Sequence, residues 1–246
     1  MRKVLLIQSR KTPDLCQKEF DRFKRVCDGK AELVFESSVN LARDWQKPET
    51  LVRGYDAVLM GGSSDFFFDG GRDETKPERA ETRQVLERMR PLVSYVLQEN
   101  IPMLAVCLGH QIVAEVYGGH VTHDHAQRKM GTYELQLTDE GKNDPLFSQM
   151  PATFFAHYAH RDSVTSLPKD AVLLAQSSMC RFSALRYGDS LYTMQFHPEL
   201  EAADMLDSSD AVAEYLTGDK SIEEIVQETP LVAELVPLFL ETIVGT

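Results

Sequence analysis

The segment spanning residues 101–119 constrains the fold most strongly, because it predicts a buried strand, a tight turn and a helix in direct succession. Residues 103–106 form a short apolar run, which is typical of a buried parallel strand. Gly109 permits the turn, and apolar residues then recur at helical spacing until a Gly-Gly pair ends the pattern. Cys107 therefore lies at a strand–turn–helix junction, the position that the serine takes in a nucleophile elbow.

This stretch alone allows two interpretations of Cys107. As a nucleophile, the residue would begin a helix, where the helix dipole favours a negatively charged thiolate. As a structural residue, it would be a small buried side chain that closes the strand, as most lone cysteines are. The stretch does not decide between the two interpretations.

A second motif supplies the groups that a cysteine nucleophile requires. Residues 191–196 predict a strand, and this strand ends in the sequence His197-Pro198-Glu199. A nucleophilic thiol needs a base, and the base needs an acid that orients it. His197 and Glu199 are two residues apart, so their side chains point to the same side of an extended backbone.

A third motif is the Gly61-Gly62 pair, which follows an apolar strand pattern ending at residue 60. Glycine leaves the backbone bare, so the chain can approach a ligand closely. Backbone N–H groups in such a loop can be directed at an oxyanion.

Together the three motifs resemble the class I glutamine amidotransferase family. The matching pieces are Cys107-Leu108-Gly109-His110-Gln111, His197-Pro198-Glu199 and the Gly61-Gly62 loop, and the resemblance covers roughly residues 1–200. One departure is Ala105, because the family usually has glycine two residues before the nucleophile. The resemblance implies an enzyme that releases ammonia from the side-chain amide of glutamine through a cysteine thioester.

The resemblance also implies a role for each member of the site. Cys107 is the expected nucleophile, His197 the base that moves protons, and Glu199 the acid that orients the imidazole. The backbone N–H groups of Gly62 and Leu108 are the expected oxyanion hole.

Substrate-binding residues are expected at two further places. Gln111 lies just inside the helix that follows Cys107, and the family pattern implies that it touches bound glutamine. His160 and Asp162 match a His-x-Asp-x-Val stretch that the family carries near the α-amino and α-carboxylate ends of the substrate, so Asp162 is expected to pair with an ammonium group. The alternative is a loop with an exposed ion pair.

Three functions stay open at this stage. The first is glutamine hydrolysis, with ammonia released or passed to a separate synthetase subunit. The second is a stand-alone γ-glutamyl hydrolase or peptidase with the same triad, which the lack of a synthetase domain suggests. The third is a non-catalytic regulatory or binding module, which the complete triad disfavours.

The order of the predicted elements indicates an α/β fold with a doubly wound, mostly parallel sheet of the flavodoxin-like type. In such sheets ligands bind beyond the carboxyl ends of the strands, and Gly62, Cys107 and His197 all follow strands. A small β-rich region is expected after residue 119. We expect residues 1–200 to form the amidotransferase domain and residues 201–246 a helical extension packed on it, with helices near 211–216, 222–226 and 231–244.

Between the Gly pair and the next helix lies a loop that contains three consecutive phenylalanines, residues 66–68. The loop is expected either to cover the active site or a partner contact, or to fold back on the core.

Composition narrows the possible partners and location. The formal net charge of −12 disfavours nucleic acid and anionic membrane surfaces as partners, and no apolar run approaches the roughly 20 residues of a membrane span. Four scattered cysteines are expected to be reduced thiols of a cytoplasmic protein. His120, His123 and His125 are expected to be solvated rather than to bind metal. No glycine-rich phosphate loop is present, so no cofactor is expected.

Overall fold

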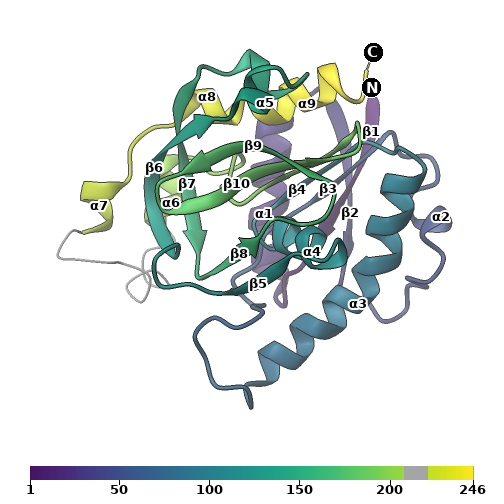
Figure 1. Ribbon diagram of the computed structural model, residues 1–246. Coiled ribbons are helices and arrows are strands. Elements are labelled where there is room, and N and C mark those ends of the chain that lie inside the picture. Colours follow the sequence, from purple (N-terminus) through teal and green to yellow (C-terminus); the bar gives the residue numbers. More distant parts are fainter. Residues whose placement is uncertain (208–220, 246) are drawn as a thin grey trace.

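A single mixed sheet forms the centre of the molecule (Figure 1). The computed structural model describes residues 1–207 and 221–245. The strand order across this sheet is β2 (Ala31–Ser37), β1 (Arg2–Gln8), β3 (Ala57–Met60), β4 (Met103–Val106), β11 (Leu191–Met194), β10 (Cys180–Tyr187), β9 (Ala171–Ser177), β6 (Lys129–Leu137) and β7 (Thr153–His160). The strands from β2 to β11 pair in parallel, and those from β11 to β7 pair antiparallel. The predicted α/β class and mostly parallel core are confirmed, and the β-rich region continues the same sheet.

Helices cover both faces of the parallel half, because its strands are apolar on both sides. On one face, α1 (Pro13–Cys27) and α9 (Leu235–Thr242) pack with Val4 and Leu6 of β1. On the other face, α3 (Pro77–Gln98) and α4 (Leu108–Val116) pack with Leu5 and Ile7 of the same strand. This alternation along β1 places one apolar core on each side of the sheet.

Capping residues define both ends of α1. Thr12 caps the start, and its hydroxyl accepts a hydrogen bond from the backbone N–H of Leu15 at 3.4 Å. Asp28 ends the helix in the left-handed conformation, with φ 44°. The helix therefore runs from Pro13 to Cys27 between these two caps.

Two short strands outside the main sheet were not predicted. β5 (His120–His123) and β8 (Asp162–Ser166) pair antiparallel as a separate two-stranded sheet. Strands of four or five residues carry too little alternation to be distinguished from a loop. The pairing matters for the site, because it fixes Asp162 at the start of β8.

The helices described after residue 200 pack in two apolar clusters, one that includes Val4 and Leu6 and a smaller one around Met130. They are α6 (Ala202–Asp207), α7 (Ile222–Ile225), α8 (Pro230–Ala233) and α9, and the remaining short helices are α2 (Pro48–Leu51), α5 (Asp139–Lys142) and the 3-10 turn Phe147–Gln149. The prediction of a single helix over residues 231–244 is wrong, because α8 and α9 are separate helices. Pro237 has no N–H to donate to the carbonyl of Ala233, and its ring crowds that carbonyl. The helix expected near 211–216 lies outside the described residues, and the domain boundary at residue 200 stays a prediction.

The two ends of the chain lie side by side (Figure 1). The guanidinium of Arg2 donates to the backbone carbonyl of Gly245, with an Nε–O distance of 2.6 Å. Among the residues described, no helix combines the length and the apolar character that crossing a bilayer requires.

Candidate active site

Cys107 occupies a strained backbone turn between β4 and α4. Its φ of 53° and ψ of −104° lie in a region that residues with a side chain rarely adopt. The backbone on both sides holds the turn, because Cys107 N–H donates to the carbonyl of Met194 at 2.8 Å and Gln111 N–H donates to that of Cys107 at 3.1 Å. The structure therefore has the predicted nucleophile elbow at this position.

Close packing beneath the elbow explains its glycine. A Cβ on Gly109 would lie 2.9 Å from the carbonyl oxygen of Met60 and 3.2 Å from the Cβ of Ala105. Both distances are tighter than ordinary contacts, so a side chain at residue 109 would push α4 away from β3 and β4. The methyl group of Ala105 itself is accommodated, fully buried in the core.

His197 and Glu199 form a buried pair at the end of β11. The Nδ1 atom of His197 lies 2.7 Å from Oε1 of Glu199, and the two side chains expose 6% and 2% of their surface. The backbone N–H of His197 donates to the carbonyl of His157 on β7 at 2.9 Å. This bond fixes the backbone position from which the imidazole side chain extends. The expected orientation of both side chains to one side of the backbone is thus present.

The electrostatics of this pair favour a charged imidazole. Burial by itself lowers the pKa of His197, but the Glu199 carboxylate and the Cys107 sulfur outweigh it and raise the pKa to about 10. Burial likewise opposes ionisation of Glu199, yet the facing imidazole lowers the pKa of its carboxyl group. At neutral pH the pair is therefore an imidazolium beside a carboxylate, and the proton-donating group of the pair is the His197 ring.

Gly62 lies against both catalytic candidates. A Cβ built on Gly62 would lie 3.1 Å from Cys107 Cβ, 3.1 Å from His197 Cε1 and 3.5 Å from Cys107 Sγ. The other expected oxyanion donor, Leu108, is the first residue of α4 and is buried. The three sequence motifs, far apart along the chain, thus meet at one point beyond the carboxyl ends of β3, β4 and β11.

The expected substrate-binding residues line a small cavity beside Cys107. The cavity is bounded by Ser63, Ser64, Phe66, Phe67, Arg72, Cys107, Gln111, Ala159, His160, Arg161 and Asp162. Gln111 Nε2 donates to the carbonyl of Asp162 at 2.8 Å and to Oε1 of Gln195 at 3.1 Å, so its amide is held in one orientation. Arg72 and Arg161 were not predicted, because Arg72 lies outside the motifs and Arg161 takes a variable position of the His-x-Asp-x-Val stretch.

His160 is neutral in this environment. Burial lowers its pKa to about 3, and the nearby Lys129 acts in the same direction. Its Nδ1 lies 3.0 Å from the backbone carbonyl oxygen of Asp162. That geometry assigns the ring proton to Nδ1, since a carbonyl oxygen only accepts.

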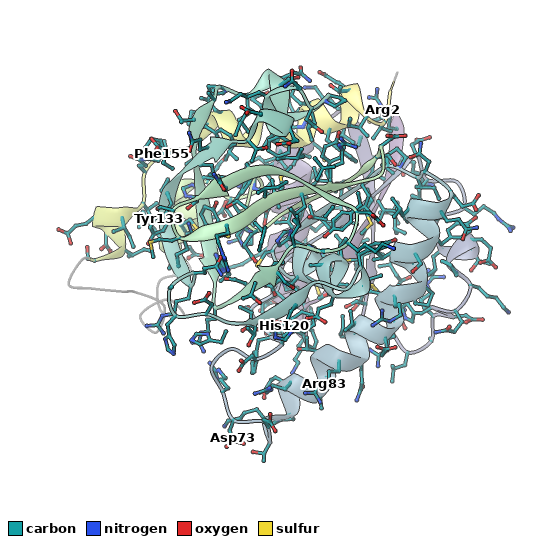
Figure 2. The ribbon with its side chains drawn as sticks, in the orientation of Figure 1. Arg2, Asp73, Arg83, His120, Tyr133 and Phe155 are labelled. Carbon is teal, nitrogen blue, oxygen red and sulfur yellow. The ribbon has the colours of Figure 1, made fainter. Side chains whose placement is uncertain are left out.

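The Asp162 carboxylate holds the loop that contains the three phenylalanines. It accepts hydrogen bonds from the backbone N–H groups of Phe68 at 2.7 Å, Asp69 at 3.1 Å and Gly70 at 2.6 Å. The alternative of an exposed ion pair is wrong, because Asp162 is buried. Beyond its contacts with Asp162 the loop runs outward, and Figure 2 shows Asp73 projecting from the lower side of the molecule.

The closed loop leaves little space. The cavity measures about 40 Å³, room for a few water molecules at roughly 10–15 Å³ each. Small-molecule pockets usually measure about 300–1,000 Å³. The cavity is therefore much smaller than a typical small-molecule pocket.

The described residues, 1–207 and 221–245, contain no group of three or more His, Cys, Asp or Glu side chains placed to hold a metal ion. His123 and His125 stack edge to face with ring centroids 4.4 Å apart. The site itself offers a thiol, a charged imidazole with an orienting carboxylate, and backbone N–H groups. These are the parts needed for nucleophilic attack on a carbonyl carbon.

Comparison with known proteins places the chain among glutamine-hydrolysing relatives. The family model "Glutamine amidotransferase class-I" matches residues 67–205. The chain is 37% identical over 116 residues to the glutamine-hydrolysing GMP synthase subunit of Methanothermobacter thermautotrophicus, covering 47% of this chain and 60% of the relative. It is 36% identical over 106 residues to the corresponding protein of Methanopyrus kandleri, covering 43% and 55%. The matches thus span only about 55–60% of the length of these curated relatives.

Solved structures show the same fold. A glutamine amidotransferase from Thermotoga maritima matches all of this chain and 99% of its own, with a TM-score of 0.70 and 21% identity. A glutamine amido transferase from Methylobacillus flagellatus matches 97% of this chain and 91% of its own, with a TM-score of 0.67 and 19% identity. Because the family model covers more than half of the sequence and includes both Cys107 and His197, the chain belongs to the class I glutamine amidotransferase family.

Proposed function

We propose that this chain hydrolyses the side-chain amide of glutamine and releases ammonia. The observation that carries the proposal is the meeting of Cys107, the His197–Glu199 pair and Gly62 at one point, where Cys107 also lines a cavity. The relatives in Methanothermobacter thermautotrophicus and Methanopyrus kandleri are named as glutamine-hydrolysing, which supports the choice of glutamine as substrate.

The reaction begins with attack of the Cys107 thiolate on the amide carbon of glutamine. The carbonyl oxygen becomes an oxyanion, and the backbone N–H groups of Gly62 and Leu108 donate hydrogen bonds to it. The His197 imidazolium protonates the amide nitrogen as the carbon–nitrogen bond breaks, so ammonia leaves and a γ-glutamyl thioester remains. His197 then takes a proton from water, which attacks the thioester and releases glutamate. Glu199 holds the imidazole and stabilises its cation throughout.

Glutamine binding is proposed to use the residues that line the cavity. The amide of Gln111 is fixed by Asp162 O and Gln195, so it can contact the substrate without reordering. The carboxylate of Asp162 has about four lone-pair positions, and the three N–H groups of the loop occupy three of them. One position is left for the α-ammonium group of glutamine.

A separate synthetase subunit is the proposed acceptor of the ammonia. The relatives are named as subunits of GMP synthase, which supports a partner of the kind that makes GMP. The closed loop over the small cavity supports a partner-dependent gate, because docking that releases the loop would open the site.

The function is tested by measuring glutamate and ammonia release from glutamine, with the chain alone and with a GMP synthetase subunit from the same source. We expect a low kcat for the chain alone and a higher kcat with the partner. High turnover without a partner would contradict the gate. Rapid cleavage of a γ-glutamyl peptide with poor use of glutamine under both conditions would favour a stand-alone γ-glutamyl hydrolase.

Replacement of Gly62 by alanine tests the oxyanion loop. The added Cβ would lie 3.1 Å from atoms of both Cys107 and His197, so the loop has to shift and its N–H group moves away from the oxyanion. We expect kcat for glutamine to fall by about 100-fold or more, the loss seen when one oxyanion donor is removed. Steady-state kinetics measures this, with thermal unfolding as the check that the fold persists. An unchanged kcat would remove Gly62 from the mechanism.

A further inference from the structure

A buried ion pair lies beneath the loop that carries Gly62. Arg10 follows β1 and Glu19 lies in the middle of α1. The guanidinium of Arg10 donates to Glu19 Oε1 from Nη2 at 2.8 Å and from Nε at 3.2 Å. The two side chains expose 11% and 2% of their surface. A buried ion pair contributes little net stability, since desolvation offsets the attraction, so stability alone does not account for it.

The pair contacts the loop on both sides of Gly62. On one side, the Glu19 carboxylate packs directly on the backbone of Gly61, where an added Cβ would lie 2.6 Å from Oε1. On the other side, Nη1 of Arg10 donates to Ser64 Oγ at 3.4 Å.

The residue after Arg10 adds a third point of attachment. The backbone N–H of Lys11 donates to the Asp65 carboxylate at 3.0 Å. The segment 61–65 is therefore held against residues 10–19 at three points, with Gly62 between the first and the second.

Such attachment matters because two consecutive glycines, such as Gly61 and Gly62, leave the backbone more conformational freedom than residues with side chains do. An N–H group stabilises an oxyanion only if it points at the right place before the reaction begins. Gly62 has no side chain that could fix its own orientation, and its surface toward Cys107 has to stay free for the substrate. Part of the restraint is the hydrogen bond from the backbone N–H of Gly61 to the carbonyl of Ile7 at 3.0 Å, and the ion pair adds to it from the side away from Cys107.

We propose that Arg10 and Glu19 are positioning residues that fix the direction of the Gly62 N–H group. This inference rests on the proposed function, because it assigns the pair to the oxyanion loop of that reaction. Arg10 is also well suited to remain charged there. Burial opposes its charge, but Glu19 and, more weakly, Cys107 raise the pKa of the guanidinium.

The test uses the variants Arg10→Gln and Glu19→Gln and the double variant that carries both changes. The double variant leaves no unpaired charge in the interior, so it guards against a simple loss of folding. The matched control is Lys18→Gln on the same helix as Glu19. It breaks the pair between Lys18 and Asp207 of α6, whose side chains are 55% and 63% exposed.

Four quantities are measured for each variant. They are kcat and KM for glutamine, the rate at which iodoacetamide alkylates Cys107, and amide hydrogen exchange in residues 61–65. We expect kcat to fall by about 10- to 100-fold with little change in KM, since a small misplacement costs about that much. Alkylation needs no oxyanion hole and should keep its rate, whereas exchange in residues 61–65 should rise. The double variant should be no worse than the single ones, and Lys18→Gln should behave as the unchanged protein.

Two results would overturn the inference. One is unchanged kcat and unchanged exchange in both single variants. The other is a parallel fall in kcat and alkylation with unchanged exchange, which would mean that Arg10 acts on the thiolate and not on the loop. If the unchanged protein does not hydrolyse glutamine, the proposed function fails, and exchange in residues 61–65 still decides whether the pair holds the loop.

Discussion

Replacement of Cys107 by serine is expected to lower glutamine turnover by about 10⁴-fold or more. The hydroxyl of serine is close to the thiol in size, so the elbow keeps its packing between β4 and α4. It is a much weaker nucleophile, because an alcohol oxygen attacks a carbonyl carbon far less readily than a thiol sulfur does. The measurement is glutamate release over hours, with circular dichroism and thermal unfolding to show that the fold is intact.

A second buried cysteine provides the control for this change. Cys27 lies at the end of α1 and is as buried as Cys107, but it does not line the cavity. Cys27→Ala should retain the turnover of the unchanged protein, with at most a modest loss of stability. If Cys107→Ser hydrolyses glutamine at the original rate, Cys107 is not the nucleophile.

Removal of the imidazole by His197→Ala is expected to cost about as much as removal of the thiol, because members of a triad act as a unit. Glu199→Gln is expected to cost less, since Glu199 only orients the base and stabilises its cation. The comparison is made with kcat for glutamine, measured at several pH values. Loss of the carboxylate removes the main influence that raises the pKa of His197, so the pH at which the imidazole loses its proton should move downward in Glu199→Gln.

The order of these two effects is the informative result. A Glu199→Gln change that leaves both kcat and its pH dependence unaltered would mean that another carboxylate orients His197. Glu115 of α4 is another carboxylate that could be considered, but it is not suited to that role. Its carboxylate accepts a hydrogen bond at 2.6 Å from the backbone N–H of Val121, a residue of β5. Matched loss of activity in both variants would instead show that Glu199 takes part in proton transfer itself.

Much of the fold and the centre of the site could be predicted because the informative patterns are local. The apolar run before Cys107 and the helical spacing after it define an elbow within a few residues. His197 and Glu199 belong to one short motif, and the ends of parallel strands meet at one edge of the sheet. Local spacing together with this topological rule was enough to bring Gly62 and Cys107 together.

Features that depend on distant contacts could not be predicted. Asp162 binds a loop some ninety positions away in the sequence, and nothing near Asp162 indicates those backbone partners. Glu19 fits the pattern of an ordinary surface residue on a charged helix, since its burial depends on Arg10 and Gly61. The break between α8 and α9 is different, because Pro237 was visible in the sequence and its effect on the preceding turn was overlooked.

The position of β11 has a consequence for how the enzyme is made. This strand inserts between β4 and β10, so the base and the acid reach Cys107 only after the whole antiparallel half has been synthesised. During translation the amino-terminal part emerges first, with the thiol but without its proton carrier and without the Met194 carbonyl that holds the Cys107 turn. A chain that ends before β11 lacks His197 and Glu199, so under the proposed function it should not hydrolyse glutamine. Only molecules whose sheet is complete would then turn over the substrate, which makes the topology itself a check on the finished product.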